Sequence, residues 1–371
     1  MEAAGEKGEE VAMKTKLVYV LTCDPENHYI EQALISVFSA RYWNPDAYII
    51  LIVDDMTDQL LVGKRSELLG YISEKIVIPF KDPELSSVYR SRWIKTSVRH
   101  FIKGRYLFID CDTIVCRSLE QIDTFACDIG AVWDAHLLVE DFCDNLIAST
   151  KAANISIGVD IEGEKEYFSS GVLFVQDTPN AHQLYLLWHE YWEESCQCKL
   201  FIDQPAMAKA NREMGHIIQR IPDIYNCIVF THNAYTRDAI VLHLSSYRNP
   251  SFIFSEKVLK YVQKNGLNNE WLIASILNPC STFLPFDYDV LHSTAKQRKK
   301  WRKEIALSAK GYSRFIDSSF DGFPMPSRFR WIVVALLRNR WFGLGAGLWM
   351  LWKRKYVLSH KKVIKENVCR K

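Results

Sequence analysis

The stretch "RYLFIDCDTIVCRSL" at residues 105–119 places two aspartates one residue apart, directly after an apolar run. Two carboxylates at the end of such a run repel each other, and each loses hydration if it is buried. A hard divalent cation such as Mg²⁺ or Mn²⁺ binds carboxylate oxygens and removes this repulsion. Asp110 and Asp112 are therefore predicted to be metal ligands. We expect His243, in the later segment "IVLHLSS", to complete the site, and an imidazole slightly favours Mn²⁺.

Two other interpretations of the Asp-x-Asp pattern remain open. The pair could be solvated turn or capping residues. It could also belong to a phosphatase-like hydrolase with Asp110 as the nucleophile. That nucleophile normally lies on the first strand of its domain, whereas at least two predicted strands precede Asp110. A histidine beside leucines, such as His243, is more often a core residue, and only its combination with the aspartates makes it a candidate ligand.

Alternating strand-like and helix-like segments lead to the two aspartates. Nearly continuous apolar runs at 16–24 and 47–55 are typical of parallel strands that are covered on both faces. Helical spacing is found at 29–43 and 91–103, and a short strand is expected at 75–78. This order predicts a doubly wound α/β domain, in which ligands bind beyond the carboxyl ends of the strands. Five aspartates fall at such ends: Asp24, Asp54, Asp55, Asp110 and Asp112.

The rest of the chain continues this alternation and then changes character. A strand is expected at 167–177, a long helix at 179–195, a loop leading into a short helix at 201–214, and a strand at 240–250. We divide the chain into a frayed N-terminus, an α/β domain, a mixed helical region and a basic amphipathic tail, which span 1–15, 16–250, 251–325 and 326–371.

Charge is distributed very unevenly along the 371 residues. The net charge of +2 combines a net −14 over residues 1–290 with a net +16 over residues 291–371. An acidic body with a basic tail suggests that the tail meets an anionic surface. No apolar N-terminal leader is visible, and the spacing of the 10 cysteines indicates no disulfide or metal framework. We therefore expect reduced thiols and a cytoplasmic location.

The segment 328–356 within the basic tail combines apolar runs with Trp residues and clusters of Lys and Arg. Arg338 and Arg340 interrupt the run, so neither half reaches the roughly 20 apolar residues that a spanning helix needs. The pattern favours a helix in the membrane interface, and we expect peripheral contact with the inner face of a membrane. An ordinary buried helix is the alternative. Nucleic acid is not expected as a partner, because the basic residues alternate with aliphatic runs.

Six segments, taken in order, resemble the nucleotide-diphospho-sugar transferases of the GT-A fold, particularly the family 8 glycosyltransferases. The resemblance covers about residues 16–250. In that family's order the segments are "VYVLTCD", "RSRWIKTSVRHFI", "YLFIDCDTIVCRSLEQI", "FSSGVLFVQ", "FIDQPAM" and "IPDIYN", followed by the late histidine of "IVLHLSS". The resemblance implies a GT-A (Rossmann-like) mostly parallel sheet flanked by helices. It also implies transfer of a hexose from a nucleotide sugar, UDP-linked in our expectation, to a glycan or lipid-linked acceptor with retention of configuration.

The resemblance further implies a role for particular residues. Mn²⁺ or Mg²⁺ bound by the aspartate pair and the late histidine would hold the diphosphate of the donor. Asp203 and Gln204 would lie under the donor sugar as catalytic residues. Trp133, Asp134 and His136 are candidates for lining the acceptor cleft. The residues expected to contact the donor are Thr22, Asp24, Asp54, Arg92, Lys95 and Ser170.

The chain departs from the family pattern at two places. Ser169-Ser170-Gly171 stands where the family has Asn-Ser-Gly, and no Gly and Lys follow His243, so that the nearest cation is Arg248. An inverting GT-A transferase, the hydrolase described above and a GT-A-shaped binding protein without turnover remain as alternatives.

Overall fold

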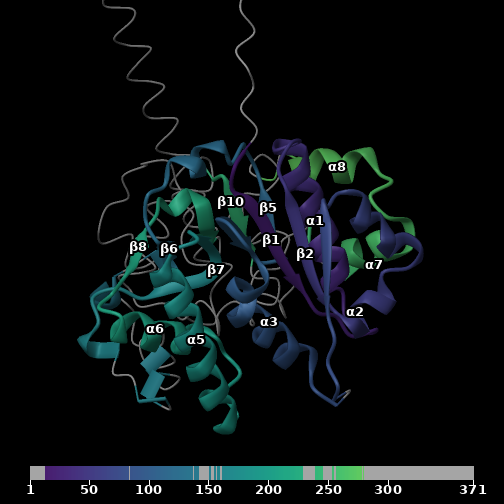
Figure 1. Ribbon diagram of the computed structural model, residues 1–371. Coiled ribbons are helices and arrows are strands. Elements are labelled where there is room, and N and C mark those ends of the chain that lie inside the picture. Colours follow the sequence, from purple (N-terminus) through teal and green to yellow (C-terminus); the bar gives the residue numbers. More distant parts are fainter. Residues whose placement is uncertain are drawn as a thin grey trace, which may run out of the picture.

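A computed structural model describes most of the acidic part of the chain. The described residues are 13–279 except 83, 137, 142–149, 152–153, 156, 159–160, 229–238, 245–252, 255 and 278. Within them a seven-stranded sheet has the strand order β3-β2-β1-β4-β7-β6-β8 (Figure 1). Its strands are β1 (Lys16–Leu21), β2 (Ile49–Asp54), β3 (Glu74–Ile78), β4 (Tyr106–Ile109), β6 (Ile129–Trp133), β7 (Phe168–Val175) and β8 (Ile218–Arg220).

The sheet is mixed but mostly parallel. Strands β3, β2, β1 and β4 pair in parallel, β7 runs antiparallel to both β4 and β6, and β8 is parallel to β6. The predicted α/β class, with a mostly parallel sheet flanked by helices, is confirmed. The antiparallel position of β7 next to β4 was not predicted. It brings Gly171 to the end of β4, where Asp110 N donates to Gly171 O at 2.9 Å.

Helices cover both faces of this sheet. The α-helices are α1 (Tyr29–Trp43), α2 (Asp55–Leu60), α3 (Ser87–Phe101), α5 (Pro179–Gln197), α6 (Gln204–Glu213), α7 (Glu256–Asn265) and α8 (Glu270–Leu277). Short 3₁₀ helices are η1 (Gly63–Gly70), η2 (Glu120–Thr124), η3 (Asp134–His136), η4 (Val139–Asp141), η5 (Ile161–Gly163) and η6 (Asp223–Asn226). Helices α7 and α8 belong to the predicted mixed region, and both pack against α1.

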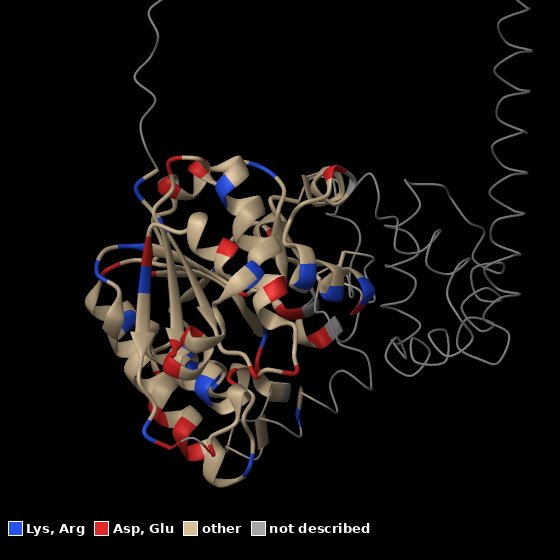
Figure 2. Cartoon of the chain, turned by 90° about the vertical axis from the view of Figure 1, so that its right-hand side faces the viewer, with Lys and Arg blue, Asp and Glu red and all other residues tan. Residues whose placement is uncertain are grey.

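The continuous apolar runs in the sequence arise because both faces of the sheet are buried. In β1, Leu17, Tyr19 and Leu21 join one core cluster that includes residues of α1, α7 and α8. Val18 and Val20 point to the opposite face, into a second cluster with α3, α5 and α6. The inner strands are accordingly almost free of charged residues, which lie on the helices and at strand ends (Figure 2).

A second, three-stranded sheet lies beside the end of β4. It consists of β5 (Thr113–Val115), β9 (Cys227–Ile228) and β10 (Val241–His243), in the order β5-β10-β9. Antiparallel pairing of β10 with β5 sets His243 opposite Thr113, and Leu244 N donates to Asp112 O at 2.9 Å. This register brings the late histidine to the Asp-x-Asp segment.

Several sequence-based expectations fall partly or wholly beyond the described residues. The predicted interfacial tail 326–371 and Arg248 lie outside them, so membrane contact stays a prediction. No helix in the described part of the chain is long and apolar enough to cross a membrane. The seven cysteines that the structure describes are free thiols.

Candidate functional site

Asp110, Asp112 and His243 converge at the junction of the two sheets. Each offers a ligand atom, and these atoms all lie within 4.8 Å of one another. His243 Nε2 lies 3.2 Å from Asp112 Oδ1. The two aspartates come from the link between β4 and β5, while the histidine comes from β10. Two carboxylate oxygens and one imidazole nitrogen form a donor set that suits Mn²⁺ or Mg²⁺.

Gly171 provides the space for this cluster. A Cβ atom there would lie 2.3 Å from His243 Cε1 and 3.2 Å from an Asp110 carboxylate oxygen. On the other side of the ring, His243 Nδ1 lies 2.9 Å from Asn226 Oδ1, so Nδ1 donates its proton outward. In the neutral ring the proton would then stay on Nδ1, and the lone pair of Nε2 would be available to a cation between the aspartates, which is the tautomer that a metal ligand requires. The residues present therefore fit a divalent cation.

The ionisation of the three groups is linked. Burial raises the pKa of Asp110, as does the neighbouring charge of Asp112, while Lys95 opposes both effects. Burial also disfavours the charged form of Asp112, but His243 more than offsets it, and the pKa of Asp112 lies below its usual value. Burial lowers the pKa of His243, but the two carboxylates outweigh it, so that the pKa is raised.

Lys95, on α3, connects the aspartate pair to a second part of the site. Its side chain is 2 % exposed, and its ammonium group lies 3.2 Å from Asp110 Oδ1, 3.2 Å from Ser170 Oγ and 3.3 Å from Asp203 Oδ2. The structure thus brings together four predicted site residues, Lys95, Asp110, Ser170 and Asp203, from four separate segments of the chain. Because Lys95 is enclosed by these partners, its contacts are those of a buried counter-ion to two carboxylates.

Asp203 is held ionised at the start of α6. Its carboxylate accepts from Ser170 Oγ at 2.8 Å and lies 3.0 Å from Arg92 Nε. Burial would raise the pKa of Asp203, but Lys95, Arg92 and Ser170 together bring it far below its usual value. An aspartate just before a helix often caps that helix, yet this side chain makes no capping hydrogen bond to α6. Its carboxylate is directed instead at the cationic side chains of the site.

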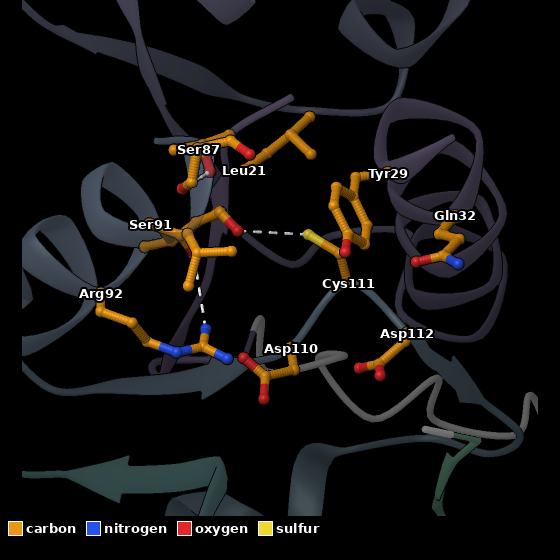
Figure 3. Close-up of a pocket in the computed structure, with 12 residues that line it drawn as sticks. Leu21, Tyr29, Gln32, Ser87, Ser91, Arg92, Asp110, Cys111 and Asp112 are labelled. Atoms are coloured by element: carbon orange, nitrogen blue, oxygen red, sulfur yellow. Dashed lines mark hydrogen bonds between the residues drawn. The ribbon is translucent and has the colours of Figure 1, made fainter. Parts of the chain in front are cut away.

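A pocket of about 170 Å³ opens beside the aspartates. It lies at the carboxyl ends of β1 and β4 and between the first turns of α1 and α3, where ligands bind in α/β sheets. Figure 3 shows Asp110 and Asp112 at one end of this pocket, the guanidinium of Arg92 near Asp110, and Tyr29 and Gln32 on the α1 side. Its lining consists of Val20, Leu21, Thr22, Tyr29, Gln32, Ser87, Val88, Ser91, Arg92, Asp110, Cys111 and Asp112.

Thr22 and Asp24, expected at the base and ribose, and Asp54, expected to touch the nucleotide, occupy different positions. Thr22 lines the pocket, although its hydroxyl donates to Ser87 O at 2.7 Å. Asp24 is half-exposed next to the pocket and accepts a hydrogen bond from the Ser87 hydroxyl. Asp54 is fully buried, caps α2 through Thr57 N at 2.7 Å, and pairs with the guanidinium of Arg90. These contacts give Asp54 a structural role, and its expected donor contact stays a prediction.

The remaining candidates are Gln204, expected under the donor sugar, and Trp133 and His136, expected to line the acceptor cleft. Gln204 is the first residue of α6 and interacts with the hydroxyl of Tyr167. Trp133 ends β6, and the Arg220 guanidinium lies 3.6 Å from the centre of its ring. His136 is buried, where its Nε2 accepts from Ile228 N at 2.9 Å. Its acceptor role also stays a prediction.

Two features of the site were missed by reasoning from the sequence. Tyr29 was assigned only to a helix, yet its side chain is 43 % exposed and forms one wall of the pocket. Its position in the first turn of a helix that follows a nucleotide-type strand was the available signal. Asn226 lies in the segment "IPDIYN", but no role was predicted for it. An asparagine that is buried behind a histidine has no recognisable spacing in the sequence.

Comparison with known proteins gives similarity in structure only. No protein-family model matches the chain, and no curated protein matches it by sequence. Among solved structures, the chain is similar to the galactosyltransferase LgtC bound to donor and acceptor sugar analogues, with a TM-score of 0.44 and 15 % identity over 70 % of this chain and 96 % of LgtC. It is also similar to mouse xyloside xylosyltransferase 1, with a TM-score of 0.39 and 13 % identity over 62 % of this chain and 97 % of the other.

A third similar structure is the glycosyltransferase GlyE of Streptococcus pneumoniae TIGR4. The TM-score is 0.41 and the identity 14 %, over 73 % of this chain and 64 % of GlyE. All three are glycosyltransferases, the class that the sequence resembles. Because the TM-scores lie below 0.5, the function of this chain has to be inferred from its own site.

Proposed function

We propose that this protein is a metal-dependent glycosyltransferase that moves a hexose from a nucleotide sugar, UDP-linked, to a glycan or lipid-linked saccharide, with retention of configuration. One observation carries the proposal. Asp110, Asp112 and His243, which are far apart in the sequence, offer ligand atoms within 4.8 Å of one another at the edge of a pocket. A third carboxylate, Asp203, is linked to that cluster through Lys95.

The reaction breaks the bond between the sugar C1 and the diphosphate, and the nucleoside diphosphate leaves with the bonding electrons. Asp110, Asp112 and His243 would hold a divalent cation, and that cation would supply a Lewis acid for the departing diphosphate. Arg92, at the rim of the pocket, is placed to contact phosphate oxygens because a guanidinium suits them. The ionised carboxylate of Asp203 can stabilise positive charge that develops at C1. The acceptor hydroxyl forms the new bond to C1, and its proton passes to the departing nucleoside diphosphate.

The shape and lining of the pocket suit the nucleoside part of the donor. Tyr29 offers the face of an exposed aromatic ring, on which a base can stack. Gln32 and Ser91 add amide and hydroxyl groups on the two sides of the pocket. These residues support a binding mode in which the base lies between α1 and α3 and the diphosphate lies next to the aspartates. Val20, Leu21 and Thr22, at the carboxyl end of β1, line the same pocket.

The decisive measurement is release of nucleoside diphosphate from a panel of sugar nucleotides by the purified full chain. It is made with Mn²⁺, with Mg²⁺ and with chelator, for wild type and Asp112→Asn. We expect slow hydrolysis of one donor that needs the cation and is lost in the variant. Once the acceptor is known, the anomeric configuration of the product tests retention.

Other outcomes would point to the alternatives. Cation-dependent binding of a nucleotide without consumption would indicate a binding protein. Release of phosphate from phosphate esters, together with a covalent phosphoryl group on Asp110, would indicate a hydrolase. If the protein neither binds nor consumes any nucleotide when Mn²⁺ is present, the proposal is overturned. The lipid-linked acceptor and the inner-face location remain proposals that rest on residues 326–371 of the sequence.

A further inference from the structure

We propose that Asn226 and Ser169 act as a positioning pair that fixes the orientation and tautomer of the His243 imidazole. The inference rests on the proposed function, because it concerns what lies behind the candidate cation site. Asn226 does not line the pocket, and its side chain is fully buried. Its two amide atoms are both engaged, with His243 on one side and Ser169 on the other.

The contacts form a short chain that ends at the metal-ligand nitrogen. Asn226 Oδ1 accepts from His243 Nδ1 at 2.9 Å, and Asn226 Nδ2 donates to Ser169 Oγ at 3.1 Å. Ser169 Oγ also accepts from Gly171 N at 3.3 Å. With the amide held this way, the single proton of a neutral ring stays on Nδ1, so that Nε2 can bind a cation. The reversed amide would donate to Nδ1 and leave the proton on Nε2, where it would block a cation.

The backbone holds this pair in place. Asn226 is the last residue of η6 and directly precedes β9, whose Ile228 pairs in parallel with His243 of β10. Ser169 lies in β7, two residues before Gly171, where the missing side chain makes room for the ring. The imidazole therefore lies between the bare backbone of β7 and the amide of Asn226. Rotation about its side-chain bonds would cost the hydrogen bond to Asn226.

Ser169, which stands where the family that the sequence resembles has asparagine, takes part in this arrangement. A serine hydroxyl is short, and here it receives hydrogen bonds from a backbone N–H and from the Asn226 amide. The hydroxyl thus holds the amide of Asn226 toward the ring. Partners of this kind behind a ligating histidine affect metal affinity by about 10- to 100-fold.

The test is binding of Mn²⁺ alone to the chelator-stripped full chain, measured by isothermal titration calorimetry. We expect Asn226→Ala to weaken Mn²⁺ binding by about 10- to 100-fold and Ser169→Ala to weaken it less. Asn226→Asp should keep binding at or above the wild-type level, because a carboxylate can only accept from Nδ1. Asn211→Ala is the matched control. Asn211 is also buried and accepts from Ile218 N at 2.9 Å, but it lies away from the site, so Mn²⁺ binding should be unchanged.

The outcomes separate this inference from the proposed function. If His243→Ala weakens Mn²⁺ binding but Asn226→Ala does not, the positioning pair is overturned and the cation site stands. Loss of binding in Asn226→Asp equal to that in Asn226→Ala would also overturn it. If wild type binds no Mn²⁺, both proposals fall. Should Asn226→Ala not fold, the Mn²⁺ affinities of Ser169→Ala and Asn226→Asp still support or overturn the positioning pair.

Discussion

Lys95 lies between the candidate cation site and Asp203 and is nearly inaccessible to solvent. A buried ammonium group that is paired with two carboxylates compensates the cost of burying all three charges. Removing it would leave Asp110 and Asp203 with one fewer partner each. At the scale of single residues, Lys95 is thus the shared counter-ion of the site.

Lys95→Met should therefore destabilise the protein by about 3 kcal/mol in the presence of chelator, since it removes the buried ammonium group that Asp110 and Asp203 share. Added Mn²⁺ should recover part of this loss, because the cation replaces the positive charge next to Asp110. Urea unfolding followed by circular dichroism measures both effects. Lys260→Met, at an exposed pair with Glu256, is the control and should change the stability little. A variant as stable as wild type in chelator would contradict the assignment.

Gly171→Ala should reduce the rate of donor consumption by about 100-fold, because a displacement of about 1 Å at a reacting group has effects of this size. The added Cβ would lie 2.3 Å from His243 Cε1, so the ring must move. Gly70→Ala is the matched control, since nothing lies within 4 Å of the Cβ that it would add. Initial rates with Mn²⁺ compare the three proteins. A wild-type rate for Gly171→Ala would show that the ring position is unimportant.

At the scale of elements, Asp54 and Arg90 connect the end of β2 with the first turn of α3. Both side chains are buried, and the same carboxylate caps α2. Arg90 also lies 3.3 Å from Asp24, which follows the end of β1. The first turns of α3, which form one wall of the pocket, are thereby fixed to the ends of two strands.

Asp54→Ala should lower the free energy of unfolding by about 3 kcal/mol or more, because Arg90 loses its buried partner. Asp54→Asn should cost less, since an amide oxygen can still accept from Thr57 N. Urea unfolding and the KM for the donor are measured on both variants. A stable Asp54→Asn variant with weakened donor binding would instead support the donor contact that was predicted from the sequence.

The strands and helices of the first half of the sheet were predicted well from the sequence. Helix α1 was predicted with its observed bounds, because the helical spacing of its apolar residues extends over the whole of Tyr29–Trp43. Helix α3 was predicted to begin at residue 91 but begins at Ser87, where Ser86 accepts from Tyr89 N at 3.2 Å. The first turn of this helix faces the pocket and lacks the apolar spacing that marks a buried face.

Pairing between distant segments could not be predicted from local patterns. The insertion of β7 next to β4 and the β5-β10-β9 sheet depend on register between strands that are far apart in the chain. For the same reason the sequence suggested Asp110, Asp112 and His243 as ligands only through their residue types and the family resemblance. Local patterns did not indicate Asn226, nor that Lys95 is a buried link between two carboxylates.

At the scale of the whole molecule, hydrogen bonds to Asp123 in η2 hold the residues that precede β1. Its carboxylate accepts from Lys14 N at 2.7 Å and from Thr15 Oγ1 at 2.6 Å, and it lies 3.1 Å from Arg105. Burial raises the pKa of Asp123, but these partners more than offset it, so the pKa lies below its usual value. The ionised form is therefore favoured by folding.

A carboxyl group whose pKa is lower in the folded than in the unfolded state stabilises the protein at pH values above the unfolded pKa of about 3.9. That contribution disappears as the pH falls through the folded pKa. Asp123→Asn should thus be less stable than wild type by about 1 kcal/mol at pH 7, and the two proteins should converge as the pH falls below about 4. Urea midpoints from pH 7 to pH 3 measure the difference. A gap that stays constant with pH would contradict this assignment.

The balance of charge around Lys95 has a kinetic consequence. Three carboxylates, Asp110, Asp112 and Asp203, face two cationic side chains of the described site, Arg92 and Lys95. A diphosphate approaching this surface alone meets the carboxylates of Asp110 and Asp112 and is repelled by them. A divalent cation bound between these two carboxylates would replace the repulsion with attraction. Substrate addition should therefore follow a compulsory order, with the cation first and the sugar nucleotide second, and each should slow the departure of the other.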